Sequence, residues 1–123
     1  MRFLFPLLVL LVASCSNGSP ATLVADGNSA LGSGDSKTAL AKFDAALAEL
    51  PPEDPNYEIA AFGRVEALAS ENPAECVREI QSMAADGSLE DRDFSQFGGA
   101  LASAGNLTHA VDVLDAGMKA HPE

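Results

Sequence analysis

The sequence has few cationic and few aromatic residues. Its 123 residues include 7 Lys and Arg against 18 Asp and Glu, which gives a formal net charge of −11, and they include one Tyr and no Trp. The cations are scattered singly, so no basic stripe is present to neutralise phosphates and no nucleic-acid partner is expected. The length allows one small domain and a processing segment. Because 47% of the residues are hydrophobic and 20% are charged, the chain can bury a core.

The N-terminal apolar run is too short to cross a bilayer. It extends from Phe3 to Val12, is interrupted by Pro6 and follows a cationic start at Arg2. At about ten residues it has roughly half the length of a membrane-spanning helix, which is typical of the core of a signal peptide.

The residues that follow are Val12, Ala13, Ser14 and Cys15, and this order resembles a bacterial lipoprotein signal. The resemblance implies that residues 1–14 are removed, that the thiol of Cys15 is lipidated, and that residues 15–19 form a short tether. The alternative is an ordinary secretory signal in which Cys15 is incidental. We therefore expect a lipid anchor in a bacterial membrane with a periplasm-facing domain. Ser16 replaces the aspartate that retains some lipoproteins in the inner membrane, which slightly favours the outer membrane.

Cysteine is scarce in the rest of the chain. With Cys15 assigned to lipid, Cys76 has no partner for an intramolecular disulfide. It lies beside Val77 and four residues before Ile80 on an apolar helical face, which predicts a small buried hydrophobe. A mixed disulfide with another protein is the alternative.

Residue patterns typical of catalysis are missing. The glycines before Lys37 and Thr38 do not form a phosphate loop, because Ser36 and Leu31 stand where that loop requires glycine. There is no Gly-x-Ser-x-Gly motif and no Ser-x-x-Lys pair. We expect no enzymatic activity and no cofactor.

Metal binding is not expected either. His109 and His121 have no companion ligand at a suitable spacing, and we expect both to face solvent. No calcium-loop pattern occurs. The carboxylates of Glu90, Asp91 and Asp93 cluster where a helix is expected to begin, and negative charge at that end suits the helix dipole.

The chain contains an internal repeat. Seven positions recur 71 residues later with every interval preserved: Leu23, Gly27, Gly34, Ala39, Phe43, Ala46 and Pro51 match Phe94, Gly98, Gly105, Ala110, Leu114, Gly117 and Pro122. A weaker copy lies between them, with Gly63, Cys76, Ile80 and Met83 at related positions. Its first interval is one residue longer, and no proline closes it.

The period and residue types resemble the tetratricopeptide repeat, over about residues 20–122. The resemblance implies about three antiparallel helical hairpins stacked as a short α-solenoid, with small residues where the helices of a hairpin approach. Local signals predict the same helices, because Ser19-Pro20, Gly34-Asp35 and Asn72-Pro73 are typical caps and turns. No strand pattern occurs. We therefore predict an all-α fold, with residues 20–123 as the repeat domain.

The resemblance also implies a function in protein binding, because the first helices of such repeats line a groove that holds a segment of another protein. The residues that register places on that side are Val24, Asn28, Tyr57, Arg64 and Ser95. Val24 stands where some relatives have a carboxylate-binding lysine. We expect an envelope scaffold that binds a protein or peptide partner. The alternative is an accessory subunit that completes a larger helical assembly by association with itself or with another chain.

Overall fold

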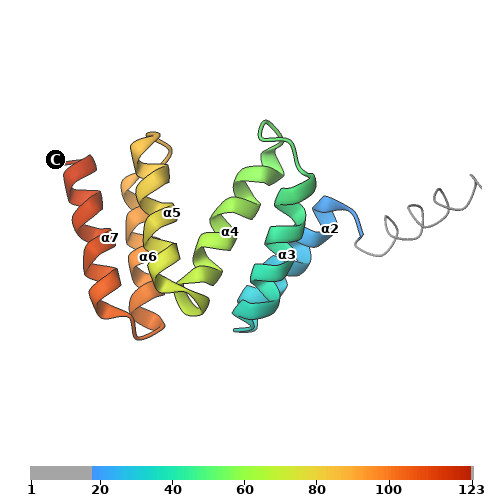
Figure 1. Cartoon of the computed structure of the whole chain (residues 1–123), viewed down its shortest axis with the longest axis horizontal. Coiled ribbons are helices and arrows are strands. Elements are labelled where there is room, and N and C mark those ends of the chain that lie inside the picture. The colour runs from blue at the N-terminus through green and yellow to red at the C-terminus, as the bar shows by residue number, and fades with distance from the viewer. Residues whose placement is uncertain (1–17, 123) are drawn as a thin grey trace, which may run out of the picture.

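The computed structural model describes residues 18–122, and within this range the chain forms only helices (Figure 1). The helices are α2 (Pro20–Gly32), α3 (Ser36–Glu49), α4 (Pro55–Glu71), α5 (Pro73–Ala85), α6 (Asp91–Ser103) and α7 (Leu107–Ala120). They follow one another from α2 to α7, and each helix is packed against the next except α5, which is packed against α4 and α7 rather than α6. The predicted all-α class with a repeat-like series of hairpins is confirmed.

Residues 1–14, which are expected to form a signal peptide, Cys15 and the first part of the expected tether lie outside the described residues. None of the described helices is both long enough and apolar enough to span a bilayer.

The helix ends agree with the local signals. Ser19 caps α2 by accepting a hydrogen bond from the backbone N–H of Thr22 at 3.2 Å. The α2–α3 and α6–α7 turns pass through Gly34 and Gly105, whose φ angles are 81° and 85°. Only glycine adopts this left-handed conformation without strain, so these two residues allow each pair of helices to fold back as a hairpin.

The middle hairpin is connected differently. The chain turns from α4 into α5 at Asn72 alone, which ends the first helix and caps the second by accepting a hydrogen bond from the N–H of Glu75 at 3.2 Å. Pro73 occupies the first turn of α5, where its missing N–H has no helical partner. Because no glycine turn interrupts α4, this helix continues to Glu71, which explains why the middle copy departs from the spacing of its neighbours.

The core consists of two clusters that share α4. The N-terminal cluster joins α2, α3 and α4 around Phe43, and the C-terminal cluster joins α4, α5, α6 and α7 around residues such as Ile80, Phe97 and Leu101. Small residues bring the helices together. A Cβ built on Gly27 would lie 2.7 Å from Phe43 Cε1, and one built on Gly63 would overlap the same ring.

The third hairpin repeats this packing with other residues. A Cβ built on Gly98 would lie 3.0 Å from Leu114 Cδ2, and one built on Gly117 would lie 2.8 Å from Phe94 Cγ. In the first and third hairpins, Gly27, Gly98 and Gly117 therefore lie where large side chains of the paired helix approach most closely, as the repeat predicts, whereas Gly63 of the middle copy contacts α3 of the preceding hairpin.

Candidate binding groove

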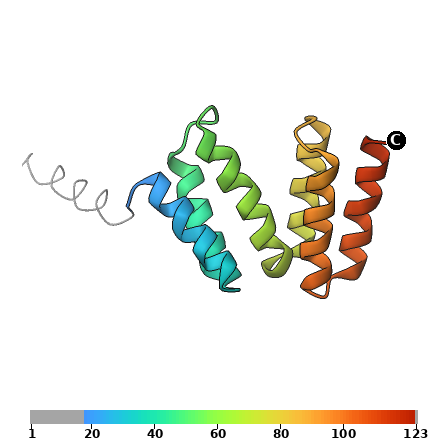
Figure 2. The ribbon, with the colours of Figure 1, turned by 180° about the vertical axis from the view of Figure 1, so that it is seen from behind.

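A groove of about 510 Å³ lies over the first helices of the three hairpins. It is bordered by Asn28, Leu31 and Gly32 of α2, by Glu58, Ile59, Phe62, Gly63 and Glu66 of α4, and by Gln96 of α6. Figure 2 shows these helices from the side on which α2 and α6 lie in front of α3 and α5. The hairpin arrangement therefore brings residues from three distant parts of the chain to one surface.

The groove has an apolar floor and a polar border. Ile59 is 47% exposed, and Phe62 is half-buried with its ring centroid 5.6 Å from that of Phe97. At the border, Gln96 donates a hydrogen bond to Glu66 Oε1 at 3.0 Å, and Glu58 is exposed. Such a surface suits a segment that presents an apolar side chain next to a cation or a hydrogen-bond donor.

The five residues predicted from register do not lie together. Asn28 is exposed and borders the groove. Tyr57 and Arg64 border a separate depression that is also lined by residues of α3 and α5. Ser95 lies beside α7 at the C-terminal end of the molecule.

The prediction for Val24 is wrong. This side chain is 4% exposed and belongs to the N-terminal core cluster. Leu23 and Val24 are both buried, because adjacent positions of α2 face α3 and α4 at the same time. Val24 therefore stabilises the hairpin and is not available to a partner.

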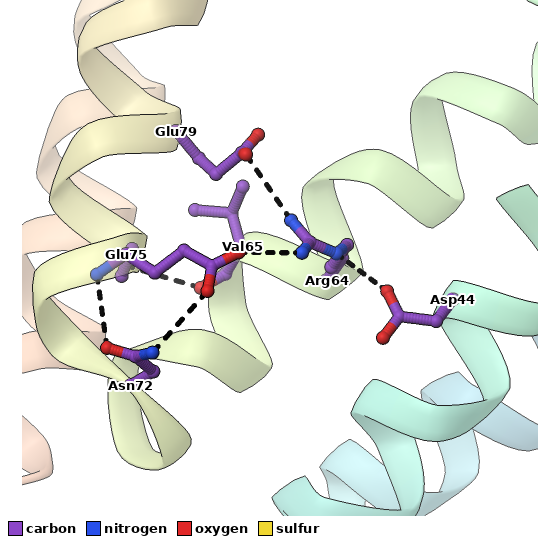
Figure 3. Close-up of polar contacts among 7 residues, drawn as sticks. Asp44, Arg64, Val65, Asn72, Glu75 and Glu79 are labelled. Carbon is purple, nitrogen blue, oxygen red and sulfur yellow. Dashed lines mark hydrogen bonds and ion pairs between the residues drawn. The ribbon is translucent and has the colours of Figure 1, made fainter.

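Arg64 is engaged with its own fold (Figure 3). From α4, its guanidinium donates to Asp44 of α3 at 2.7 Å and to Glu75 of α5 at 2.8 Å, and a third nitrogen lies 3.5 Å from Glu79. Burial alone would lower the pKa of Arg64, but the hydrogen bonds to Asp44 and Glu75 reverse this effect and the pKa is raised. The side chain acts as a bridge between three helices.

Cys76 is a fully buried thiol, as predicted. It has no exposed surface, and its Sγ donates a weak hydrogen bond to the backbone carbonyl of Val65 at 3.4 Å. Burial raises the pKa of the thiol from 9.0 to about 11. Because the thiolate is the reactive form, this position is chemically inert in the folded protein.

The remaining polar candidates have structural contacts. Glu90 and Asp93 form the capping box of α6, in agreement with the predicted helix start. His121 lies with Nε2 at 3.2 Å from the carbonyl of Leu89 and with Nδ1 at 3.7 Å from Asp91. Across residues 18–122, no group of three His, Cys, Asp or Glu side chains is arranged to hold a metal ion.

The groove residues that register missed are Ile59, Phe62 and Glu66. A signal for Ile59 and Phe62, but not for Glu66, is the contrast within α4, where the small residues Ala60 and Ala67 belong to the N-terminal core cluster and Gly63 contacts Phe43 of α3. Large apolar residues between such small contact positions point away from the contact. Comparison with known protein families, with curated proteins and with solved structures finds no match to this chain.

Proposed function

We propose that the protein is a lipid-anchored scaffold of the bacterial envelope that binds a segment of another protein in the groove over α2, α4 and α6. The observation that carries this proposal is the apolar floor at Ile59 and Phe62 within a border of Glu58, Glu66 and Gln96. An exposed apolar side chain inside a concave, multi-helix surface is typical of a recognition site.

The groove fits a short amphipathic or extended segment of a partner protein. The groove volume of about 510 Å³ is enough for a few side chains, and the net charge of −11 favours a segment with cationic residues. The repeat-like architecture supports the same function, because helical hairpins in a row present one continuous surface formed by their first helices.

The test is site-specific crosslinking in intact cells. A photoreactive side chain at Ile59 in the groove is compared with one at Ala48, which is exposed on α3 away from the groove. We expect a discrete protein adduct from position 59, its loss when Phe62→Asp is added, and no such adduct from position 48. An equal yield from both positions, or no adduct at Ile59, would contradict the groove as a binding site.

The anchor is proposed from the N-terminal pattern. Cys15→Ser removes the thiol that would carry the lipid, so we expect the chain to leave the membrane pellet on cell fractionation. The controls are Cys76→Ser, which keeps Cys15, and circular dichroism, which checks that the helices persist. If the Cys15→Ser chain stays in the pellet, the lipid anchor is wrong.

The second candidate, an accessory subunit of a larger helical assembly, is favoured by one observation. Most of the large hydrophobic side chains that the described part of the chain exposes lie on its last helix, α7.

A further inference from the structure

Helix α7 exposes an apolar stripe on one face. Leu107, Val111, Leu114 and Met118 are 65%, 63%, 44% and 71% exposed, and their spacing of four, three and four residues aligns them along the helix. Within residues 18–122, Ile59 in the groove is the other large hydrophobic residue with comparable exposure. Such a concentration on one helix marks an interaction surface.

The internal repeat shows how the equivalent face is covered elsewhere in the molecule. The stripe of α7 corresponds to Ser36, Leu40, Phe43 and Leu47 of α3, which lie 71 residues earlier. There α4 packs over the face, so Phe43 is fully buried and Leu40 and Leu47 are partly buried. Gly63 of α4 allows the close approach, because a side chain at that position would overlap the Phe43 ring.

The corresponding site on α7 is open. Leu114 contacts Gly98 of α6 but remains 44% exposed, and a depression of about 360 Å³ lies beside it, bordered by Phe94, Gly117 and Met118. A helix with a small residue at its centre fits over Leu114 in the way that α4 fits over Phe43.

The charges beside the stripe select the partner. Asp112 is exposed on α7 and Asp91 borders the depression together with His121, whose Nδ1 lies 3.7 Å away, while the exposed Asp115 is paired with Lys119 at 3.1 Å. A second copy would bring the same acidic groups and a net charge of −11 against them. A helix with basic residues beside its apolar stripe is complementary to this surface.

We propose that the exposed face of α7 binds an amphipathic helix of another protein, with basic residues at its edges, in the position that α4 occupies on α3. This proposal rests on the second candidate function. Because the α7 face is separate from the groove, the α7 proposal and the groove proposal can fail independently.

The test uses the mature chain, residues 15–123, with Cys15→Ser so that no detergent is needed. The probe is a fluorescent 17-residue peptide with the sequence of α4, Pro55–Glu71, in which Glu58, Glu66 and Glu71 are replaced by Lys. The unmodified α4 peptide is the charge control. Fluorescence anisotropy measures binding to the mature chain and to two variants of it, Val111→Ser with Met118→Ser, and Ile59→Ser in the groove.

We expect the basic peptide to bind, with affinity that falls as salt is added, and the acidic control peptide to bind more weakly. The α7 double variant should weaken binding by about tenfold or more, because two apolar contacts are lost, whereas Ile59→Ser should leave it unchanged. Both variants replace exposed residues, and circular dichroism confirms that they fold.

Three results would overturn the proposal. They are absence of peptide binding, an equal loss with Ile59→Ser, and a dimer in analytical ultracentrifugation that the α7 double variant dissociates. The last result would assign the face to a second copy of the chain. Failure of crosslinking at Ile59 alone would contradict the groove and leave the α7 surface intact.

Discussion

Phe43 is the residue on which two hairpins depend. Its ring is fully buried between Gly27 of α2 and Gly63 of α4, so one side chain fixes the distance between three helices. Glycine is unfavourable inside a helix, because it loses more conformational freedom on folding than alanine does. The close contact offsets this cost at both positions.

Gly63→Ala should therefore destabilise the fold. The added methyl group would overlap the Phe43 ring, which is packed on its other side by α2, and we expect a loss of about 1–3 kcal/mol in the free energy of unfolding. Urea denaturation followed by circular dichroism measures the change. The matched control is Gly99→Ala on α6. A Cβ built at Gly99 meets no atom within 4 Å beyond its chain neighbours and the backbone of its own helix, so a gain of about 0.5–1 kcal/mol is expected. A stabilised Gly63→Ala chain would contradict the packing.

Cys76 makes stability depend on alkaline pH. Its pKa is raised from the ordinary value of 9.0 to about 11 in the folded protein, because burial disfavours the thiolate. The thiol therefore contributes its full stability below about pH 9, and the contribution is lost as the pH rises from about 9 toward 11.

The measurement compares a chain of residues 15–123 with its Cys76→Ala variant, both carrying Cys15→Ser, by urea denaturation at several pH values. We expect the free energy of unfolding of the chain with Cys76, taken relative to that of the Cys76→Ala variant, to fall by about 2 kcal/mol between about pH 8 and pH 11. Subtraction removes the titration of groups that the two chains share. A difference independent of pH would show that the thiol is not buried.

At the scale of elements, α4 is the connection between the two halves. It contributes to both core clusters, and Arg64 joins it to α3 through Asp44 and to α5 through Glu75 and Glu79. These ion pairs link helices that short turns alone would leave free to shift.

Arg64→Met keeps most of the side-chain packing but leaves the three carboxylates without their cation. Asp44 and Glu79 are 52% and 43% exposed, so solvent screens the pairs and we expect a loss of about 1 kcal/mol in stability. The loss should shrink in about 0.5 M NaCl. Lys119→Met is the control, because its pair with Asp115 is an exposed contact within one helix and should change stability by about 0.5 kcal/mol or less. Equal losses in both variants would contradict a bridging role.

The sequence predicts these elements better than it predicts the surface. Caps, turns and helix lengths depend on residues close in the chain, so Ser19, Gly34 and Asn72 could be assigned directly. The contact between Gly27 and Phe43 could be predicted because a second copy repeats it. The partners of Arg64 and the burial of Val24 could not, because they depend on how neighbouring helices are rotated against each other.

The groove could not be predicted because it too depends on how neighbouring helices are rotated against each other. Register alone does not say which face of α4 remains free after α3 and α5 are packed against it, and only Asn28 among the five candidates borders the groove. The contribution of α4 to the groove is set by tertiary packing, since Gly63 contacts α3, Ile59 remains exposed and Phe62 is half-buried against Phe97 of the C-terminal core.

At the scale of the whole molecule, two cores in a row predict graded stability. Contacts in such an arrangement join mainly neighbouring helices, so each region depends on its own interfaces and on the next. The C-terminal core contains Leu101, which is fully buried in α6, and the N-terminal core contains Phe43.

Leu101→Ala should therefore destabilise the C-terminal helices more than the N-terminal ones. Removal of this side chain leaves a cavity and should lower the free energy of unfolding by about 2–5 kcal/mol. The interfaces of α5, α6 and α7 should be the ones weakened. Native-state hydrogen exchange measured by mass spectrometry should show faster exchange in these helices than in α2 and α3, with α4 between them. Phe43→Leu should give the reverse pattern. A uniform rise in the exchange rate across all helices would contradict graded stability. It would mean that Arg64 and the shared packing of α4 couple the two cores into one cooperative unit. In that case Leu101→Ala combined with Arg64→Met should restore the graded pattern.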